Sequence, residues 1–145
     1  MVDAFPATRS ALDLRVLLRE VLPTAEQFDL VVIGGGPGGY AAALYAASAG
    51  VNVALVEKDA LGGTCLNRGC IPAKAFLETA AVHRHVQHAA EFGINASEPT
   101  VDFAVTQARK QKIVAGLVGG IAAMCKGRKV TVFNGTGSLG ADKVV

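Results

Sequence analysis

The residues of this chain best suited to do chemistry are two cysteines, Cys65 and Cys70, in the segment GGTCLNRGCIPAK. Two nearby thiols can exchange two electrons by closing and opening a disulfide. On a regular helix, positions five apart lie about 140° apart around the axis, whereas the Cα atoms of a disulfide normally lie within about 7 Å of each other. If the two cysteines bond, we expect Cys65 to lie before the helix proper or in a distorted first turn, with Gly69 loosening the backbone between them.

Two other interpretations of Cys65 and Cys70 remain open: unlinked thiols, or half of a zinc site. A zinc half-site needs further ligands at suitable spacings, and none appears near the pair. The histidines at positions 83, 85 and 88 do not share one helical face, so we predict no metal site. Cys125 has no partner nearby in the sequence and is expected to be a buried packing residue. We therefore favour a redox pair.

A strand, a glycine run, a helix and a second strand precede the cysteines. The first strand, FDLVVI over residues 28–33, is short, apolar and β-branched, as buried parallel strands are. The run GGGPGG follows at once, then an alanine-rich helical stretch over residues 40–49 and an apolar strand over residues 51–56. This order predicts an α/β, Rossmann-like fold, in which helices flank a parallel sheet.

The glycine run fits the pattern G-x-G-x-x-G through Gly34, Gly36 and Gly39. Such glycines let backbone N–H groups approach a pyrophosphate at the start of the helix. Glu57 ends the second strand, about 20 residues further on, where an acid accepts a hydrogen bond from a ribose hydroxyl. The pattern alone does not separate FAD from NAD, because both carry an ADP half. The cysteine pair decides for FAD, since a dithiol that exchanges two electrons reversibly needs an isoalloxazine ring beside it.

The rest of the chain predicts supporting structure. A helix runs from residue 71 to about residue 91, and a loop covers residues 93–100. A second long helix over residues 101–125 precedes a strand over residues 129–133 and an Asn-Gly turn signal. The net charge of only +2 favours solvated basic helix ends over a nucleic-acid surface. No stretch is apolar for about 18 residues, so no membrane span is expected.

At these motifs the sequence resembles the flavin disulfide oxidoreductases, most closely their dihydrolipoamide dehydrogenase branch. The resemblance rests on FDLVVIGGGPGGYAAALYAASAG, VALVEK, GGTCLNRGCIPAK and GGIAAMCKGRKVTVFNGTGSLG, and covers roughly residues 28 to 145. Two positions depart from the family pattern. Ala73 stands where the family usually has Ser or Thr, and Arg68 stands where Val is common. Neither change removes a sulfur or a phosphate contact, so we expect tuning rather than loss of function.

The resemblance implies a role for each matching residue. Cys65 would be the interchange thiol that attacks the substrate disulfide, and Cys70 would lie against the flavin. The residues implied to bind FAD are Gly34, Gly36 and Gly39 at the pyrophosphate, Glu57 at the ribose, Thr64 and Lys74 on the flavin side, and Gly137 at the adenine end. We also infer that Arg68 and Lys74 contribute positive charge that lowers a thiol pKa, as a helix N-terminus does.

The resemblance further implies an enzyme that oxidises dihydrolipoamide, the lipoyl arm of a 2-oxo acid dehydrogenase complex. Electrons would pass through the Cys65–Cys70 disulfide and FAD to NAD. The full-length enzyme would be a homodimer, and a redox-active disulfide fits a reducing cytoplasm. Neither nucleic acid nor a membrane is an expected partner. The alternatives are a related glutathione or mercuric reductase, or a catalytically incomplete flavin-binding module.

Members of this family are much longer than 145 residues. They continue with a second dinucleotide domain for NAD and an interface domain that carries a His–Glu pair. We therefore expect a fragment, with a helical extension or linker over residues 1–27 and the N-terminal part of an FAD-binding domain over residues 28–145. Such a fragment would be inactive alone, and its open sheet edge would favour aggregation.

Overall fold

The structure, a computed structural model, describes residues 26–141 and 144–145. The extension or linker predicted over residues 1–27 therefore lies almost entirely outside the described residues. Within them, three parallel strands form one sheet in the order β1-β2-β3. These strands are β1 (Leu30–Ile33), β2 (Val53–Glu57) and β3 (Thr131–Asn134). In register, Leu30 lies beside Val53 and Ala54 beside Thr131. The predicted α/β, Rossmann-like class with a parallel sheet is confirmed.

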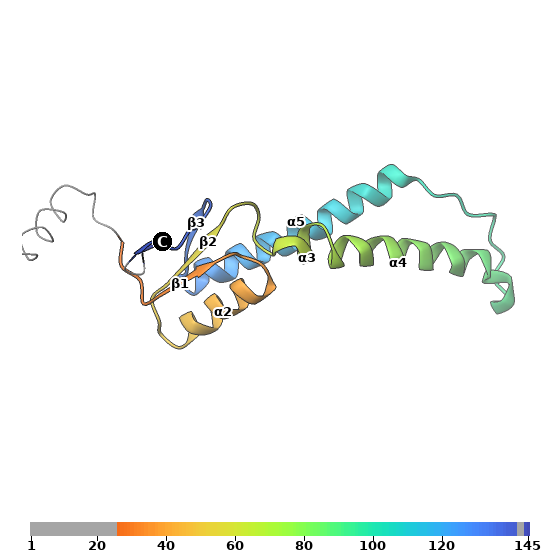
Figure 1. Ribbon diagram of the computed structural model, residues 1–145. Coiled ribbons are helices and arrows are strands. Elements are labelled where there is room, and N and C mark those ends of the chain that lie inside the picture. The colour runs from red at the N-terminus through yellow and green to blue at the C-terminus, as the bar shows by residue number, and fades with distance from the viewer. Residues whose placement is uncertain (1–25, 142–143) are drawn as a thin grey trace, which may run out of the picture.

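Four α-helices and one short 3₁₀ helix complete the described chain. They are α2 (Pro37–Ser48), α3 (Gly63–Asn67), α4 (Cys70–Gln87), η1 (Ala89–Phe92) and α5 (Phe103–Gly127). Helices α4 and α5 pack side by side and extend away from the sheet, joined by a long loop at their far end (Figure 1). At the other end of this helical hairpin, the C-terminal part of α5 lies beside α2 and the sheet, and α4 begins beside α3.

The helix limits differ slightly from those expected. Helix α5 begins at Phe103 rather than at residue 101, because Asp102 is its N-cap. The Asp102 carboxylate accepts hydrogen bonds from the N–H groups of Ala104 at 2.9 Å and Val105 at 3.2 Å. These bonds satisfy donors that have no partner inside the helix. Helix α2 already begins at Pro37 rather than at residue 40, since proline suits the first helical position.

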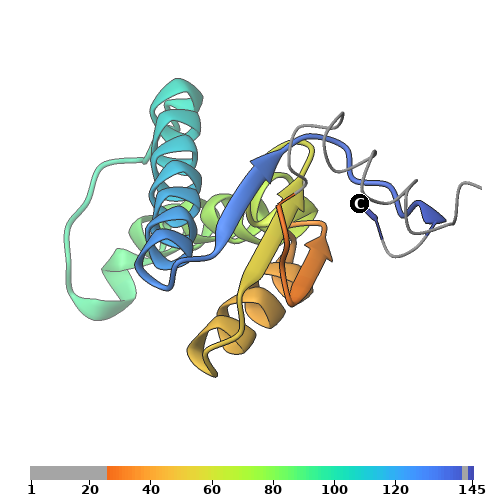
Figure 2. The ribbon, with the colours of Figure 1, turned by 90° about the vertical axis from the view of Figure 1, so that its left-hand side faces the viewer.

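The core forms where the sheet meets α2 and α5. Strand β2 lies in the middle of the sheet, and its residues Val53 and Leu55 are fully buried. Ala43 and Leu44 of α2 and Ile121 and Cys125 of α5 belong to the same buried cluster. Figure 2 shows the chain leaving α5 and entering β3 beside β2. A continuously apolar central strand is the pattern expected for a parallel sheet with helical cover.

Strand β1 lies at an edge of this sheet in the described part of the chain. Its outer residues Leu30 and Ile33 are 36% and 49% exposed. The backbone groups of an edge strand offer pairing sites to another chain. The expected open edge is thus present, whereas aggregation stays a prediction.

The first turn of α2 packs so closely on the end of β1 that Gly39 has no room for a side chain. We expect Gly39→Ala to lower the free energy of unfolding by roughly 3 kcal/mol or more, because a Cβ at Gly39 would lie only 1.7 Å from the Gly34 carbonyl oxygen. Gly38→Ala is the matched control, since a Cβ there meets no atom within 4 Å. Alanine at Gly38 should even stabilise the helix, by up to about 1 kcal/mol. Urea denaturation of both variants makes the comparison, and equal stabilities would contradict the observed packing.

Candidate functional site

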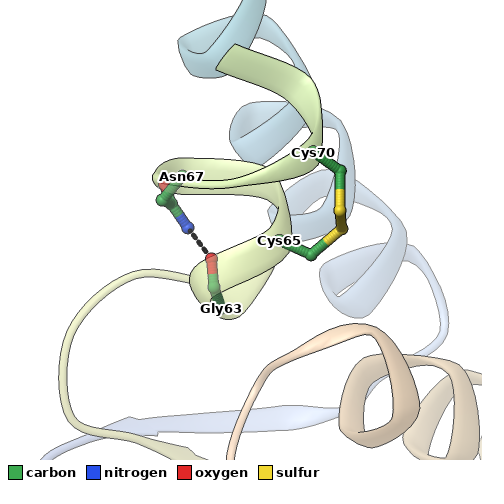
Figure 3. The surroundings of a disulfide bond; sticks show 4 residues. All are labelled: Gly63, Cys65, Asn67 and Cys70. Atoms are coloured by element: carbon green, nitrogen blue, oxygen red, sulfur yellow. Dashed lines mark hydrogen bonds between the residues drawn. A yellow bond between two sulfur atoms is a disulfide. The ribbon is translucent and has the colours of Figure 1, made fainter. Parts of the chain in front are cut away.

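Cys65 and Cys70 form a disulfide between two successive helices (Figure 3). Cys65 lies in the short helix α3, and Cys70 is the first residue of α4. Their Cα atoms are 4.9 Å apart, within the usual range for a disulfide. The expectation that Cys65 precedes the helix proper is confirmed, because a break at Arg68 and Gly69 separates the two helices.

The break between α3 and α4 depends on Gly69 for room. A Cβ at Gly69 would lie 3.2 Å from the Thr64 carbonyl oxygen and 3.5 Å from the Cα of Cys65. The glycine thus lets the chain fold back over the residue that carries the first sulfur. The contribution of Gly69 is this close approach, rather than a left-handed backbone conformation.

The side chain of Asn67, the last residue of α3, hydrogen-bonds back to the start of the helix. Its side-chain Nδ2 donates to the Gly63 carbonyl at 2.9 Å and to the Leu61 carbonyl at 3.1 Å. Figure 3 shows the Gly63 contact on the side of α3 opposite the sulfur atoms. Sequence reasoning missed Asn67 as a site residue. Its signal was an asparagine in the last position of a very short helix, where its amide can reach backbone carbonyls of the preceding turn.

The predicted nucleotide-binding glycines lie beside the disulfide segment. Gly34 follows β1 with a left-handed φ of 101°, and Gly36 is the N-cap of α2. A Cβ on Gly63 of α3 would lie 2.8 Å from the Cα of Gly36. The start of α2 and the start of α3 therefore meet backbone to backbone. This contact brings the glycine run and the cysteine motif, which are separate in the sequence, into one site.

Glu57 lies at the carboxyl end of β2, next to the glycine loop. Its Oε2 accepts a hydrogen bond from the Gly35 N–H at 2.6 Å, and its Oε1 accepts one from the Asp59 N–H at 2.8 Å. The residue is only 9% exposed. A carboxylate can accept further bonds on the remaining lone pairs of both oxygens. The carboxylate is therefore fixed in place with acceptor capacity left.

The other predicted FAD residues divide into two groups by position. Gly137 lies over the ends of β1 and β2, where a Cβ on it would be 3.1 Å from Ile33 Cγ2 and 3.2 Å from Val56 Cγ1. It thus lies at the same end of the sheet as Glu57. Thr64 precedes Cys65 in α3, and Lys74 lies in the second turn of α4. Both are exposed on the helices that carry the disulfide.

Arg68 has a carboxylate partner that the sequence did not predict. Its Nη2 lies 2.5 Å from Oδ2 of Asp59, and its effect on a thiol pKa stays a prediction. Both side chains are largely exposed, and exposed ion pairs contribute little to stability. Of the two cations proposed to lower a thiol pKa, Lys74 is the one with no such carboxylate contact within the described residues.

Cys125 occupies the core, as predicted. It is 1% exposed and belongs to the cluster that joins α2, α5 and the sheet. Burial raises the pKa of the Cys125 thiol, and the positive charge of Arg128 opposes this shift to a smaller extent. The residue therefore packs as a neutral apolar group.

Other parts of the described chain add no second cluster of chemical groups. Within residues 26–141 there is no group of three potential metal ligands, and His88 Nδ1 instead lies 3.0 Å from Glu91 Oε1. A largely apolar pocket of about 440 Å³ lies between α4 and α5, and it contains none of the predicted site residues. No helix in the described chain has the length and apolar character needed to cross a membrane.

The chain is similar in sequence to a known protein family and to several curated proteins. The family model for pyridine nucleotide-disulphide oxidoreductases matches residues 28–145. Over 114 residues the chain is 47% identical to a dihydrolipoyl dehydrogenase of Chlamydia pneumoniae, covering 79% of the chain and 25% of that relative. Corresponding enzymes of Bacillus subtilis and Chlorobaculum parvum are 44% and 46% identical over 115 and 122 residues, which cover 79% and 84% of the chain and 24% and 26% of those relatives. The chain thus spans about a quarter of the length of these curated relatives.

The two hydrogen bonds of Glu57 predict a cost for neutralising it. Glu57→Gln keeps one oxygen but turns an NH₂ group toward one of the two backbone donors, Gly35 or Asp59. We expect the free energy of unfolding to fall by about 1–3 kcal/mol, the cost of a buried donor without a partner. Glu78→Gln, on the exposed face of α4, is the control and should stay within about 0.5 kcal/mol. Thermal and urea unfolding of both variants provide the test, and a neutral Glu57→Gln would contradict the structure.

The buried thiol of Cys125 predicts slow chemical modification. Because burial raises its pKa, the folded protein should expose little Cys125 thiolate at neutral pH. We expect alkylation by iodoacetamide to be at least about tenfold slower at Cys125 in the folded protein than after denaturation. Mass spectrometry of the peptide that contains Cys125 measures both rates. Equal rates would show that the thiol is accessible.

Proposed function

The chain belongs to the pyridine nucleotide-disulphide oxidoreductase family, and we propose that it is the N-terminal, FAD-binding and disulfide-bearing part of a dihydrolipoyl dehydrogenase. The observation that carries the proposal is the contact between the glycine run over residues 34–39, which we call the glycine cradle, and α3, the helix that carries Cys65. Gly36 and Gly63 approach so closely that no Cβ fits between them. This contact supports the proposal because it brings the glycine run, which we assign to the dinucleotide, beside the helix that carries Cys65. The relatives named as dihydrolipoyl dehydrogenases support the specific reaction.

The residues of the cradle fit FAD through their donors and acceptors. Helix α2 begins without a side-chain cap and without an acidic residue in its first turn. Its first N–H groups can therefore donate to pyrophosphate oxygens. The Glu57 carboxylate, held by Gly35 and Asp59, retains lone pairs for ribose hydroxyls. When bound, FAD supplies a two-electron acceptor for the thiols.

The same proposal assigns Gly34, Gly36 and Gly39 to the pyrophosphate and Gly137 to the adenine end. The glycine run carries the backbone donors, and Gly137 lies at the sheet end where Glu57 is fixed. Thr64 and Lys74 are assigned to the flavin side, since both are exposed on the two helices joined by the disulfide.

The cysteines exchange electrons with the substrate by thiol–disulfide exchange. One thiol of dihydrolipoamide attacks the sulfur of Cys65, and Cys70 leaves as a thiolate. The second substrate thiol then displaces Cys65, so that lipoamide is formed as the chain's disulfide becomes two thiols. Two electrons pass from the substrate to the chain, and two thiol protons remain to be distributed between the new thiols and solvent.

The position of Cys70 favours it as the leaving thiolate. It is the first residue of the 18-residue helix α4, whose first turn has no acidic side chain. A helix N-terminus stabilises negative charge and lowers the pKa of a thiol placed there. Lys74, in the next turn, adds positive charge near the same helix end. These features support Cys70 as the thiol nearer to FAD, and Cys65 as the one that contacts substrate.

The electron acceptor, the oligomeric state and the partner are proposed for a longer protein that contains this segment. We propose NAD as the final electron acceptor, a homodimer as the active form, and the lipoyl domain of a 2-oxo acid dehydrogenase complex as the partner. Because the chain spans about a quarter of its relatives, NAD binding and dimerisation would depend on residues beyond it. A cytoplasmic location suits a disulfide that must be opened in every turnover.

The proposed function is tested by replacing one cysteine in the longest natural chain that contains this segment. We expect Cys65→Ser to reduce NAD reduction by dihydrolipoamide by at least about a thousandfold, because the sulfur that the substrate thiol attacks is lost. The flavin absorbance of the purified variant should remain, since the glycine cradle and Cys70 are intact. Cys125→Ala is the control and should retain turnover.

Three other outcomes would contradict parts of the proposal. Retained lipoamide turnover in Cys65→Ser would refute the assignment of Cys65. A parent enzyme that reduces glutathione disulfide or mercuric ion, and does not oxidise dihydrolipoamide, would move the chain to the neighbouring reductases. A natural chain that binds flavin and turns over none of these substrates would leave only a flavin-binding module.

A further inference from the structure

The helix that carries Cys65 cannot hold its shape through its own backbone alone. Helix α3 has only five residues, Gly63–Asn67, and isolated helices shorter than about 12 residues are marginal in water. Its N-cap, Gly62, offers no side-chain cap. Contacts outside the helix must therefore keep α3 folded and keep Cys65 opposite Cys70.

Asn67 supplies such contacts at the end of α3. Its side-chain amide donates two hydrogen bonds, to the carbonyls of Gly63 at 2.9 Å and Leu61 at 3.1 Å. Within the described residues, no backbone N–H donates to the Leu61 carbonyl. The Asn67 amide is therefore the group that satisfies this acceptor, and its two donors bridge α3 and the loop before it.

The loop around Leu61, which accepts one of these hydrogen bonds, is itself bonded to the glycine cradle. The N–H of Gly62 donates to the Gly35 carbonyl at 2.7 Å. The side chain of Leu61 packs against the buried core. Asn67 thus connects the turn between the two cysteines to a loop that hydrogen-bonds to the glycine run.

We propose that Asn67 is a positioning residue for the Cys65–Cys70 pair, and that its amide keeps the two thiols within bonding range after the disulfide is opened. The inference rests on the proposed function, in which the pair is reduced and reoxidised in each turnover. In the closed form the covalent bond holds the Cα atoms 4.9 Å apart. In the dithiol form only non-covalent contacts do so, and the Asn67 bonds do not involve either sulfur atom. They therefore remain available when the disulfide is gone.

The test measures how readily the disulfide re-forms. In the longest natural chain, the pair is equilibrated with glutathione, so that one protein disulfide and two glutathione thiols give two protein thiols and one glutathione disulfide. After acid quenching and alkylation, trypsin cuts after Arg68, between the two cysteines. The resulting peptides stay joined only where the Cys65–Cys70 disulfide was closed, so mass spectrometry counts the two states.

We expect Asn67→Ala to lower the equilibrium constant for disulfide closure about tenfold, because the reduced turn would gain conformational freedom that closure must remove, about the entropic cost of ordering the backbone of one residue. This change corresponds to a reduction potential about 30 mV more positive. Asn67→Asp should have at least as large an effect, because a carboxylate would face two carbonyl oxygens. The matched control is Asn52→Ala, which removes an amide that donates to the Gln27 carbonyl at 3.0 Å, at the other end of β2. The control should leave the equilibrium unchanged.

The outcomes separate this inference from the proposed function. If the parent disulfide cannot be opened and closed reversibly, the proposed function fails. If it cycles normally and folded Asn67→Ala has the parental equilibrium constant, the role of Asn67 is refuted. Should the variants not fold, a crystal structure of the reduced parent decides: an Asn67 amide still bonded to Leu61 and Gly63 supports the role, and an amide turned away from both overturns it.

Discussion

The site depends on the position of Glu57 at the end of the central strand. Its side chain accepts from Gly35 of the nucleotide loop and from Asp59 of the segment that leads to the cysteines. Its backbone carbonyl accepts from the N–H of Gly135 at 2.8 Å, just after β3. One buried residue thus joins the three segments that leave the carboxyl ends of the strands. In a parallel sheet these ends form the ligand-binding edge, so the position of Glu57 determines how the edge is arranged.

Close backbone packing then brings the disulfide to this edge. Gly36 and Gly63 touch without side chains between them, and Gly62 donates to Gly35. A larger residue at Gly63 would push α3 away from the cradle. Glycine at this position sets the distance between the starts of α2 and α3, and with it the distance from the proposed dinucleotide site to the two sulfur atoms. Because α3 is so short, it depends on Asn67 for its shape even where the glycines bring it close.

Much of this arrangement could be predicted from the sequence, because its signals are local. The strands, the glycine run and the acid at Glu57 follow from periodicity and spacing, and the break before α4 follows from disulfide geometry. Asn67 and the partner of Arg68 could not be predicted, since both depend on how the loop after β2 folds back. The start of α5 was misplaced by two residues because Asp102, rather than the apolar pattern, sets the helix boundary. Features set by neighbouring residues could be predicted, whereas contacts between separate segments could not.

The helical hairpin restrains the start of α4, which carries Cys70. Pro72 and Ala75 in the first turns of α4 are buried, and Arg109 of α5 donates from Nη1 to the Ala75 carbonyl at 3.3 Å. Phe76 and Phe103 stack with their ring centroids 5.9 Å apart. These contacts lie within the first two turns of α4, so they restrain the helix end that carries the sulfur. Cys65 is held through α3 and the loop before it, and Cys70 through α5. Because contacts other than the disulfide restrain both helices, opening the bond need not move either cysteine far, and closure can recur without refolding the site.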